Sequence, residues 1–157
     1  MKKIILLFLM FSAVVFAKWE VGTGYTTDGD FLTTFTTYDF ENGSYINIGI
    51  NVDGLGFSVV SIGSSQIKKG ANNIVLVITD NEGQDINCRF HEDDIENGSI
   101  RTQSSRSSVL TKMLYNGKSA KLMKDFETIA TFDLRGIKQI MQKHVGSSYW
   151  FKYKLND

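Results

Sequence analysis

The stretch FLTTFTTYDFENGSYINIGINV, residues 31–52, decides the fold of this chain. Its first half, residues 31–40, is rich in threonine and aromatic residues, and its second half, residues 45–52, has isoleucine at every second position up to 50. Such side chains favour strands, and a period of two places the isoleucines on one face. Asn42-Gly43 between the halves favours a tight turn. The stretch therefore predicts an antiparallel hairpin with one buried face.

The same pattern continues along the chain. Proline is absent, so residues that tolerate a positive φ have to make the turns, and Asp-Gly or Asn-Gly pairs also stand at 28–29, 53–54, 97–98 and 116–117. The run IVLVIT, residues 74–79, is apolar almost throughout, which predicts a central strand covered on both faces. Further strands are predicted at residues 19–25, 57–62, 85–90, 100–102, 118–123, 128–132 and 149–155.

Two segments change to a helical period. Apolar residues recur at helical spacing over 109–114, after a polar loop at 104–108, and again over 134–145, where Asp133 is a predicted N-cap. Eight or more short strands with two short helices predict a mainly β fold. We expect an antiparallel β-sandwich or a curled sheet, with both helices near the C-terminus, as a single domain over residues 18–157.

Residues 1–17 predict a cleaved signal peptide. Lys2 and Lys3 precede an apolar run, Ile4–Phe16, and Ala17 supplies the small residue before the cut. The run is too short for a membrane-spanning helix, which needs about 20 apolar residues. We therefore expect no transmembrane segment in the mature chain and a periplasmic or secreted location.

The charge and the cysteine content exclude several classes of partner and of stabilisation. The chain has 17 basic and 17 acidic residues, and this nearly neutral balance gives no electrostatic case for binding nucleic acid. Cys88 is the only cysteine, so an internal disulfide is impossible. We expect Cys88 to be a buried small side chain, with an intermolecular disulfide or a reactive thiol as the alternative.

No catalytic or metal-binding pattern stands out. His91 and His144 are the only histidines, and Cys88 and His91 would lie on opposite faces of a strand, which disfavours a Cys–His pair. The acidic residues at 80–85 and 91–96 do not follow the spacing of a calcium loop, and zinc needs three or four ligands. We therefore predict no catalytic residue, no metal site and no cofactor.

Two groups of residues are candidates for binding. Arg101 and Arg106 flank a serine-rich segment before a predicted helix, an arrangement that suits an anion, with a mobile surface loop as the alternative. Trp150, Phe151 and Tyr153 lie in the predicted last strand and suit a protein contact. The alternative for these rings is that they fill the core.

Three segments carry a resemblance to known families. They are residues 74–90, the run VLTKMLYNGKSAKLM at 109–123, and ATFDLRGIKQIM at 130–141. A helix, a short strand and then the motif Phe132-Asp133-Leu134-Arg135-Gly136-Ile137 resemble bacterial periplasmic proteins linked to type VI secretion. They are also similar to invasion-associated locus B proteins. The resemblance implies a β-sandwich with a short helix after the motif and no enzymatic activity.

The residues of this motif can also be assigned roles in the local structure. Phe132 is expected to end a strand facing the core, and Asp133 to cap the following helix. Gly136 is expected to let that helix approach the sheet closely. These three residues are structural candidates rather than binding ones.

These observations predict an exported, non-enzymatic protein. It would bind another envelope or extracellular protein through a strand edge or an aromatic face, as an accessory, inhibitor or virulence-related factor. The alternative is a sandwich or barrel that holds a small apolar ligand between its sheets. A hydrolase, which would need His91 or His144 beside a nucleophile, is the third hypothesis.

Overall fold

A computed structural model describes residues 18–71, 73–102 and 104–155; the predicted signal peptide, residues 1–17, lies outside this part. The described chain is mainly β, as predicted, and forms two antiparallel sheets. The first has six strands in the order β1 (Glu20–Tyr25), β2 (Phe31–Tyr38), β3 (Tyr45–Asn51), β4 (Phe57–Gly63), β8 (Ser99–Thr102) and β7 (Ile95–Glu96). The second has four, in the order β10 (Glu127–Asp133), β9 (Gly117–Lys124), β5 (Ile74–Asp80) and β6 (Asp85–Arg89).

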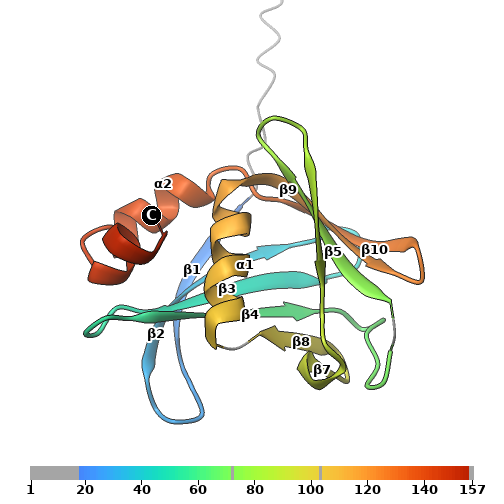
Figure 1. Ribbon diagram of the computed structural model, residues 1–157, viewed down its shortest axis with the longest axis horizontal. Coiled ribbons are helices and arrows are strands. Elements are labelled where there is room, and N and C mark those ends of the chain that lie inside the picture. Colours follow the sequence, from blue (N-terminus) through green and yellow to red (C-terminus); the bar gives the residue numbers. More distant parts are fainter. Residues whose placement is uncertain (1–17, 72, 103, 156–157) are drawn as a thin grey trace, which may run out of the picture.

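In the described part of the chain two α-helices accompany the sheets: α1 (Ser104–Asn116) and α2 (Ile137–Val145). Short helical turns lie at η1 (Glu92–Asp94) and η2 (Phe151–Leu155). Helix α1 contacts β4 of the first sheet and β5 and β9 of the second, so it packs against both sheets on one side of the molecule (Figure 1). No helix in the described part of the chain is long and apolar enough to cross a membrane.

The predicted hairpin over residues 31–52 is confirmed. Strands β2 and β3 pair antiparallel, with Thr36 opposite Asn47, and the three isoleucines of β3 are fully buried. They meet Leu76 and Ile78 of β5 and Leu114 of α1 in one hydrophobic core. Burial of each such side chain contributes about 1.5–3 kcal/mol, so packing alone can stabilise a chain that has no internal disulfide.

The prediction that residues 74–79 are covered on both faces is wrong. Ile74, Leu76 and Ile78 are buried, but Val75 and Val77 on the opposite face are only half-buried. No second layer of the described chain packs over that outer face. The sequence is apolar on both faces of β5, yet the fold covers only one of them.

The predicted last strand, residues 149–155, is also wrong, because the segment is helical and ends in η2. The Ser148 hydroxyl accepts a hydrogen bond from the Phe151 N–H at 3.2 Å, and the Lys152 N–H donates to the Ser148 carbonyl. The buried residues are Trp150, Phe151 and Leu155, which do not alternate as a strand requires. The segment is therefore helical, because Ser148 starts a helical turn, although the alternation of its residues is typical of a strand.

Helix α1 begins at Ser104, inside the segment that was predicted to be a polar loop. Ser107 and Thr111 face the core and are fully buried. The Thr111 hydroxyl lies 3.0 Å from the Ser58 hydroxyl and donates to the Ser107 carbonyl at 2.8 Å. Thr111, whose hydroxyl is bonded in this way, takes the place of an apolar residue that the helical period would otherwise show.

The FDLRGI motif differs from its interpretation at two positions. Phe132 is fully buried near the end of β10, as predicted. Asp133, however, belongs to β10 and accepts hydrogen bonds from the backbone and guanidinium of Arg135 instead of capping α2. Gly136 precedes α2 with φ 90°, and a side chain there would meet nothing within 4 Å. Its role is therefore the left-handed turn, not close packing.

Candidate functional site

Strand β6 is an outer strand of the four-stranded sheet and pairs, within the described residues, with β5 alone. In the turn before it, the Asp80 N–H donates to the Gln84 carbonyl at 2.9 Å, so these two residues form a hydrogen-bonded pair. Hydrogen-bonded and non-hydrogen-bonded pairs alternate along an antiparallel ladder. The backbone groups of Asp85, Asn87 and Arg89 therefore point away from β5, toward the free edge.

The side chains of β6 divide between the two faces of the sheet. Ile86 and Cys88 stand opposite Ile78 and Leu76, which are buried, so they face the inner side. Asn87 and its odd-numbered neighbours face the outer side. Ile86 keeps 36% of its surface exposed although it faces the core side. The inner face of the sheet is therefore incompletely covered at this edge.

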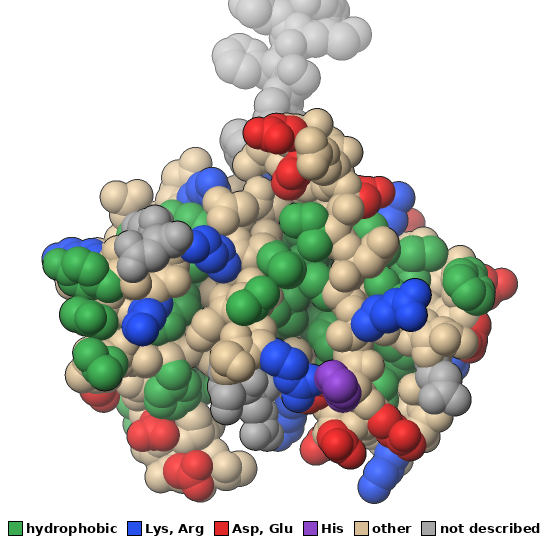
Figure 2. Space-filling model, in the orientation of Figure 1, with side chains coloured by type: hydrophobic (Ala, Val, Ile, Leu, Met, Phe, Trp, Pro, Cys, Tyr) green, Lys and Arg blue, Asp and Glu red, His purple; other side chains and the backbone are tan. Residues whose placement is uncertain are grey.

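A groove of about 290 Å³ lies between β6 and α1. Helix α1 contributes Val109, which is 54% exposed, and the half-buried Met113. The thiol of Cys88 lies 3.4 Å from the Met113 sulfur, and burial raises the pKa of that thiol. Figure 2 shows hydrophobic side chains in a band in the middle of this face, with basic side chains and a histidine below it.

One ion pair closes the end of the groove. The guanidinium of Arg106 on α1 binds both carboxylate oxygens of Asp94, at 2.5 and 2.7 Å. Asp94 lies in η1 with only 5% of its side chain exposed, and it also accepts the His91 backbone N–H at 3.3 Å. This planar, two-point contact fixes the start of α1 against the segment that follows β6.

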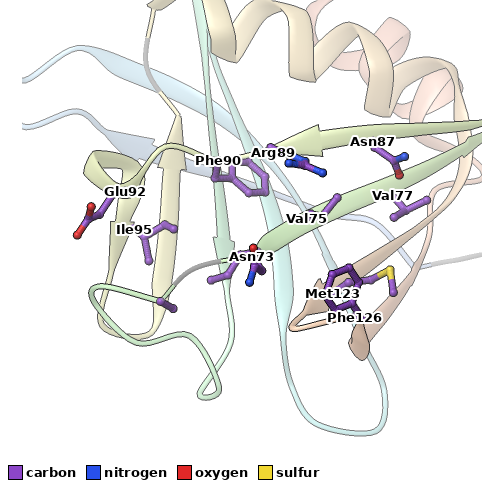
Figure 3. A pocket seen from close by; sticks show the side chains of 12 residues that line it. Asn73, Val75, Val77, Asn87, Arg89, Phe90, Glu92, Ile95, Met123 and Phe126 are labelled. Atoms are coloured by element: carbon purple, nitrogen blue, oxygen red, sulfur yellow. The ribbon is translucent and has the colours of Figure 1, made fainter.

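A second cavity, of about 380 Å³, lies on the outer face of the same strands. Val75, Val77 and Met123 form its floor, and Phe126, which is 89% exposed, stands at its side (Figure 3). Arg89 lines this cavity and the groove, because it lies near the end of β6. The free edge is thus flanked by a cavity on each face of the sheet.

The structure separates the two arginines that were predicted to hold an anion. Arg101 is exposed on β8, on the face opposite the buried Ile100 and Thr102. Arg106 is bound to Asp94 instead. The charge of Arg106 is therefore already matched by a carboxylate within the fold. The sequence did not indicate this partner, because Asp94 comes from η1, twelve positions earlier in the chain.

The C-terminal aromatic residues divide between core and surface. Trp150 and Phe151 are 2% and 4% exposed, and the Phe151 ring meets the edge of Tyr115 at 6.0 Å between centroids. Tyr153 is 54% exposed and packs on Tyr149 at 4.7 Å. The first two rings thus fill the core, which was the stated alternative, and of the three residues predicted to bind a partner Tyr153 alone is exposed.

The two histidines lie in different parts of the fold. His144 contacts the Phe35 ring edge at 6.4 Å between centroids, while His91 precedes η1. In the described part of the chain, no three His, Cys, Asp or Glu side chains gather where they could hold a metal ion.

No protein-family model, no curated protein and no solved structure matches the chain. The resemblance to periplasmic proteins linked to type VI secretion and to invasion-associated locus B proteins therefore stays a prediction. The sequence did not single out the edge of β6, because alternation identifies a strand but not its place in the sheet.

Proposed function

We propose that this chain is an exported, non-enzymatic protein that binds another envelope or extracellular protein by strand addition to β6. One observation carries the proposal: the outward backbone groups of Asp85, Asn87 and Arg89 lie between two cavities. Strand addition uses backbone hydrogen bonds for affinity and cavities for alternate side chains for specificity. Both requirements are met at this edge.

The two faces of β6 select different side chains of the partner. Alternate residues of an added strand would enter the apolar groove beside Cys88, Val109 and Met113. The residues between them would lie over the outer face, near Arg89 and Asn87. The preferred partner segment is therefore extended, with apolar residues at every second position and polar or acidic residues between them.

Export is part of the proposal and depends on the predicted signal peptide at residues 1–17. A periplasmic or secreted protein that binds an extended segment would act as an accessory, inhibitor or virulence-related factor, in line with the resemblance. Trp150 and Phe151 are not part of the proposed binding surface, because they are buried. Tyr153 stays exposed, but it lies on the C-terminal turn rather than on β6.

The volume of the outer cavity favours a second candidate function. About 380 Å³ falls in the lower range of small-molecule sites, and Val75, Val77 and Phe126 give part of its lining an apolar surface. A small apolar ligand would then occupy the outer face of the sheet, rather than the space between the sheets that the sequence predicted. Val77→Asp would abolish such binding while leaving the free edge intact.

Asn87→Pro tests the main proposal, because proline removes the outward N–H of Asn87 while an edge strand still tolerates it. The matched control is Asn87→Thr, which keeps the N–H. We expect a library of extended peptides with alternating apolar residues to bind the control and the native chain, with at least tenfold weaker binding to Asn87→Pro. In hydrogen exchange, binding should protect the amides of Asn87 and Arg89.

Equal peptide binding by the proline and threonine variants would overturn the proposal. So would protection that appears elsewhere and leaves β6 unchanged. Binding of an apolar fluorescent dye that is lost in Val77→Asp but kept in Asn87→Pro would favour the small-ligand function instead.

A further inference from the structure

The sequence of β6, Asp85-Ile86-Asn87-Cys88-Arg89, is complementary to itself when a second copy runs antiparallel to it. Asp85 and Arg89 lie at equal distances on either side of Asn87 and carry opposite charges. In a pairing centred on Asn87, each Asp85 therefore faces an Arg89 of the other copy. Opposite charges directly across an antiparallel pair are favourable, and like charges are unfavourable.

We propose that a second copy of the chain occupies this edge when no other partner is bound to it, paired antiparallel through β6 with Asn87 opposite Asn87. The inference rests on the proposed function, since it requires that the edge accepts a strand. The backbone geometry agrees with this register. Asp85, Asn87 and Arg89 all direct their N–H and C=O groups outward, so each pair of odd-numbered residues would be a hydrogen-bonded pair.

The charged side chains at this edge are arranged for such a contact. The carboxylate of Asp85 accepts the Thr79 hydroxyl at 2.7 Å through one oxygen, which holds it on the outer face. Arg89 makes no ion pair with any described residue, in contrast to Arg106 and Arg135. A second copy would supply the missing carboxylate.

Neighbouring registers lose this complementarity. With Ile86 at the centre, Asp85 faces Asn87 and Arg89 faces Gly83. With Cys88 at the centre, Asp85 faces His91 and Arg89 faces Asn87. Neither arrangement pairs an aspartate with an arginine, so charge selects the register centred on Asn87.

The inner face adds an apolar contact. In the proposed register Ile86 faces Cys88 of the second copy, in a non-hydrogen-bonded pair where side chains approach most closely. The added strand would cover the groove beside Val109. The two four-stranded sheets would join into one continuous sheet about a two-fold axis. Such an interface closes on itself and leaves neither β6 edge free for further growth.

Charge exchange tests the register. Sedimentation velocity should show a concentration-dependent dimer for the native chain, and Asp85→Arg or Arg89→Asp alone should raise the dimer dissociation constant about tenfold or more, because like charges then face each other twice. An equal mixture of the two single variants should form a heterodimer, since all the charges of one copy then oppose those of the other. That recovery also shows that each variant is folded.

A covalent test checks the same register independently. Ile86→Cys places a thiol opposite Cys88 of the second copy at a distance that suits a cross-strand disulfide. Mild oxidation should therefore give a crosslinked dimer in Ile86→Cys that joins position 86 to position 88, as peptide mapping would show. A native chain that crosslinks rapidly through Cys88 to Cys88 would contradict the register centred on Asn87.

Self-pairing and the proposed function fail in different ways. If the native chain stays monomeric up to high concentration, while peptide binding remains sensitive to Asn87→Pro, self-pairing is overturned and strand addition stands. If neither dimer formation nor peptide binding depends on Asn87, both are overturned. If both depend on it, added peptide should dissociate the dimer, because the two strands compete for one edge.

Discussion

The two outer strands of the four-stranded sheet, β10 and β6, differ in whether other residues of the chain cover their free edges. At β10 the Thr131 N–H donates to the Asp39 carboxylate at 2.6 Å, and the Ile129 carbonyl accepts the Asn42 side-chain amide at 2.6 Å. Both groups come from the loop between β2 and β3. Within the described residues, the free edge of β6 has no such cover.

The difference indicates that the edge of β10 is closed by the domain itself, whereas the edge of β6 is available to a partner. An uncovered edge is a template for pairing with another chain, and proteins normally block it. This chain uses a buried carboxylate and an amide to block one edge. It leaves the other edge open beside an apolar groove, which is the combination expected of an edge that binds a partner.

Removing the cover of β10 should have the largest effect. Asp39 is 6% exposed and accepts the N–H groups of Glu41 and Thr131 at 2.7 and 2.6 Å. Asp39→Ala leaves these donors without a partner, and we expect the free energy of unfolding to fall by about 2–3 kcal/mol in urea titrations. Asp53→Ala, at an exposed aspartate in the Asp53-Gly54 turn, is the control and should change it by less than about 0.5 kcal/mol.

Removing the ion pair at the end of the β6 groove should have a smaller effect. Arg106→Ala leaves the buried Asp94 without its cation, and we expect a loss of about 1–2 kcal/mol, since half of the arginine is exposed to water. Peptide binding to β6 should also weaken, because α1 loses its tie to η1. Arg101→Ala is the matched control on an exposed strand face, and an equal loss there would contradict the assignment.

A charged side chain on β6 should block the pairing of its free edge with another strand. Ile86→Lys introduces the kind of residue that blocks natural edge strands. Because Ile86 is already 36% exposed, we expect a stability change below about 1 kcal/mol but at least a tenfold loss of strand binding. Ile86→Val keeps the apolar contact and should bind normally, as titration calorimetry would measure.

The smallest expected effect is a dependence on alkaline pH. Burial raises the pKa of the Cys88 thiol in the folded state, so the unfolded chain loses that proton first as the pH rises. The contribution of Cys88 to stability is therefore complete below the ordinary pKa of a thiol, about 8.5, and declines above it. Comparison of the native chain with Cys88→Ser at pH 7 and pH 9.5 isolates this term; parallel curves would exclude it.

Local patterns identified much of the fold. The alternating isoleucines of β3 and the turn at Asn42-Gly43 were sufficient to predict the first hairpin, because side-chain direction and turn conformation depend on neighbouring residues. The segment at 149–155 shows the limit of such patterns. Its alternation is that of a strand, but a serine-initiated turn and core contacts of Trp150 make it helical.

The candidate site could not be predicted in the same way. The sequence marks Asp85–Arg89 as a strand but does not say whether it is central or at an edge. Likewise, Asp39 and Asn42 read as ordinary turn residues, although each bonds to a strand about 90 positions away along the chain. Contacts of that kind depend on how the sheets pack.

The sequence by itself determined the β class, the first hairpin, the absence of an internal disulfide and the positions of most strands. Only the tertiary structure decided the order of the strands, the cover over β10 and the open edge of β6 beside α1. The physical reason is range: a two-residue period and a turn are properties of adjacent residues, whereas the exposure of an edge depends on every element that could have packed against it.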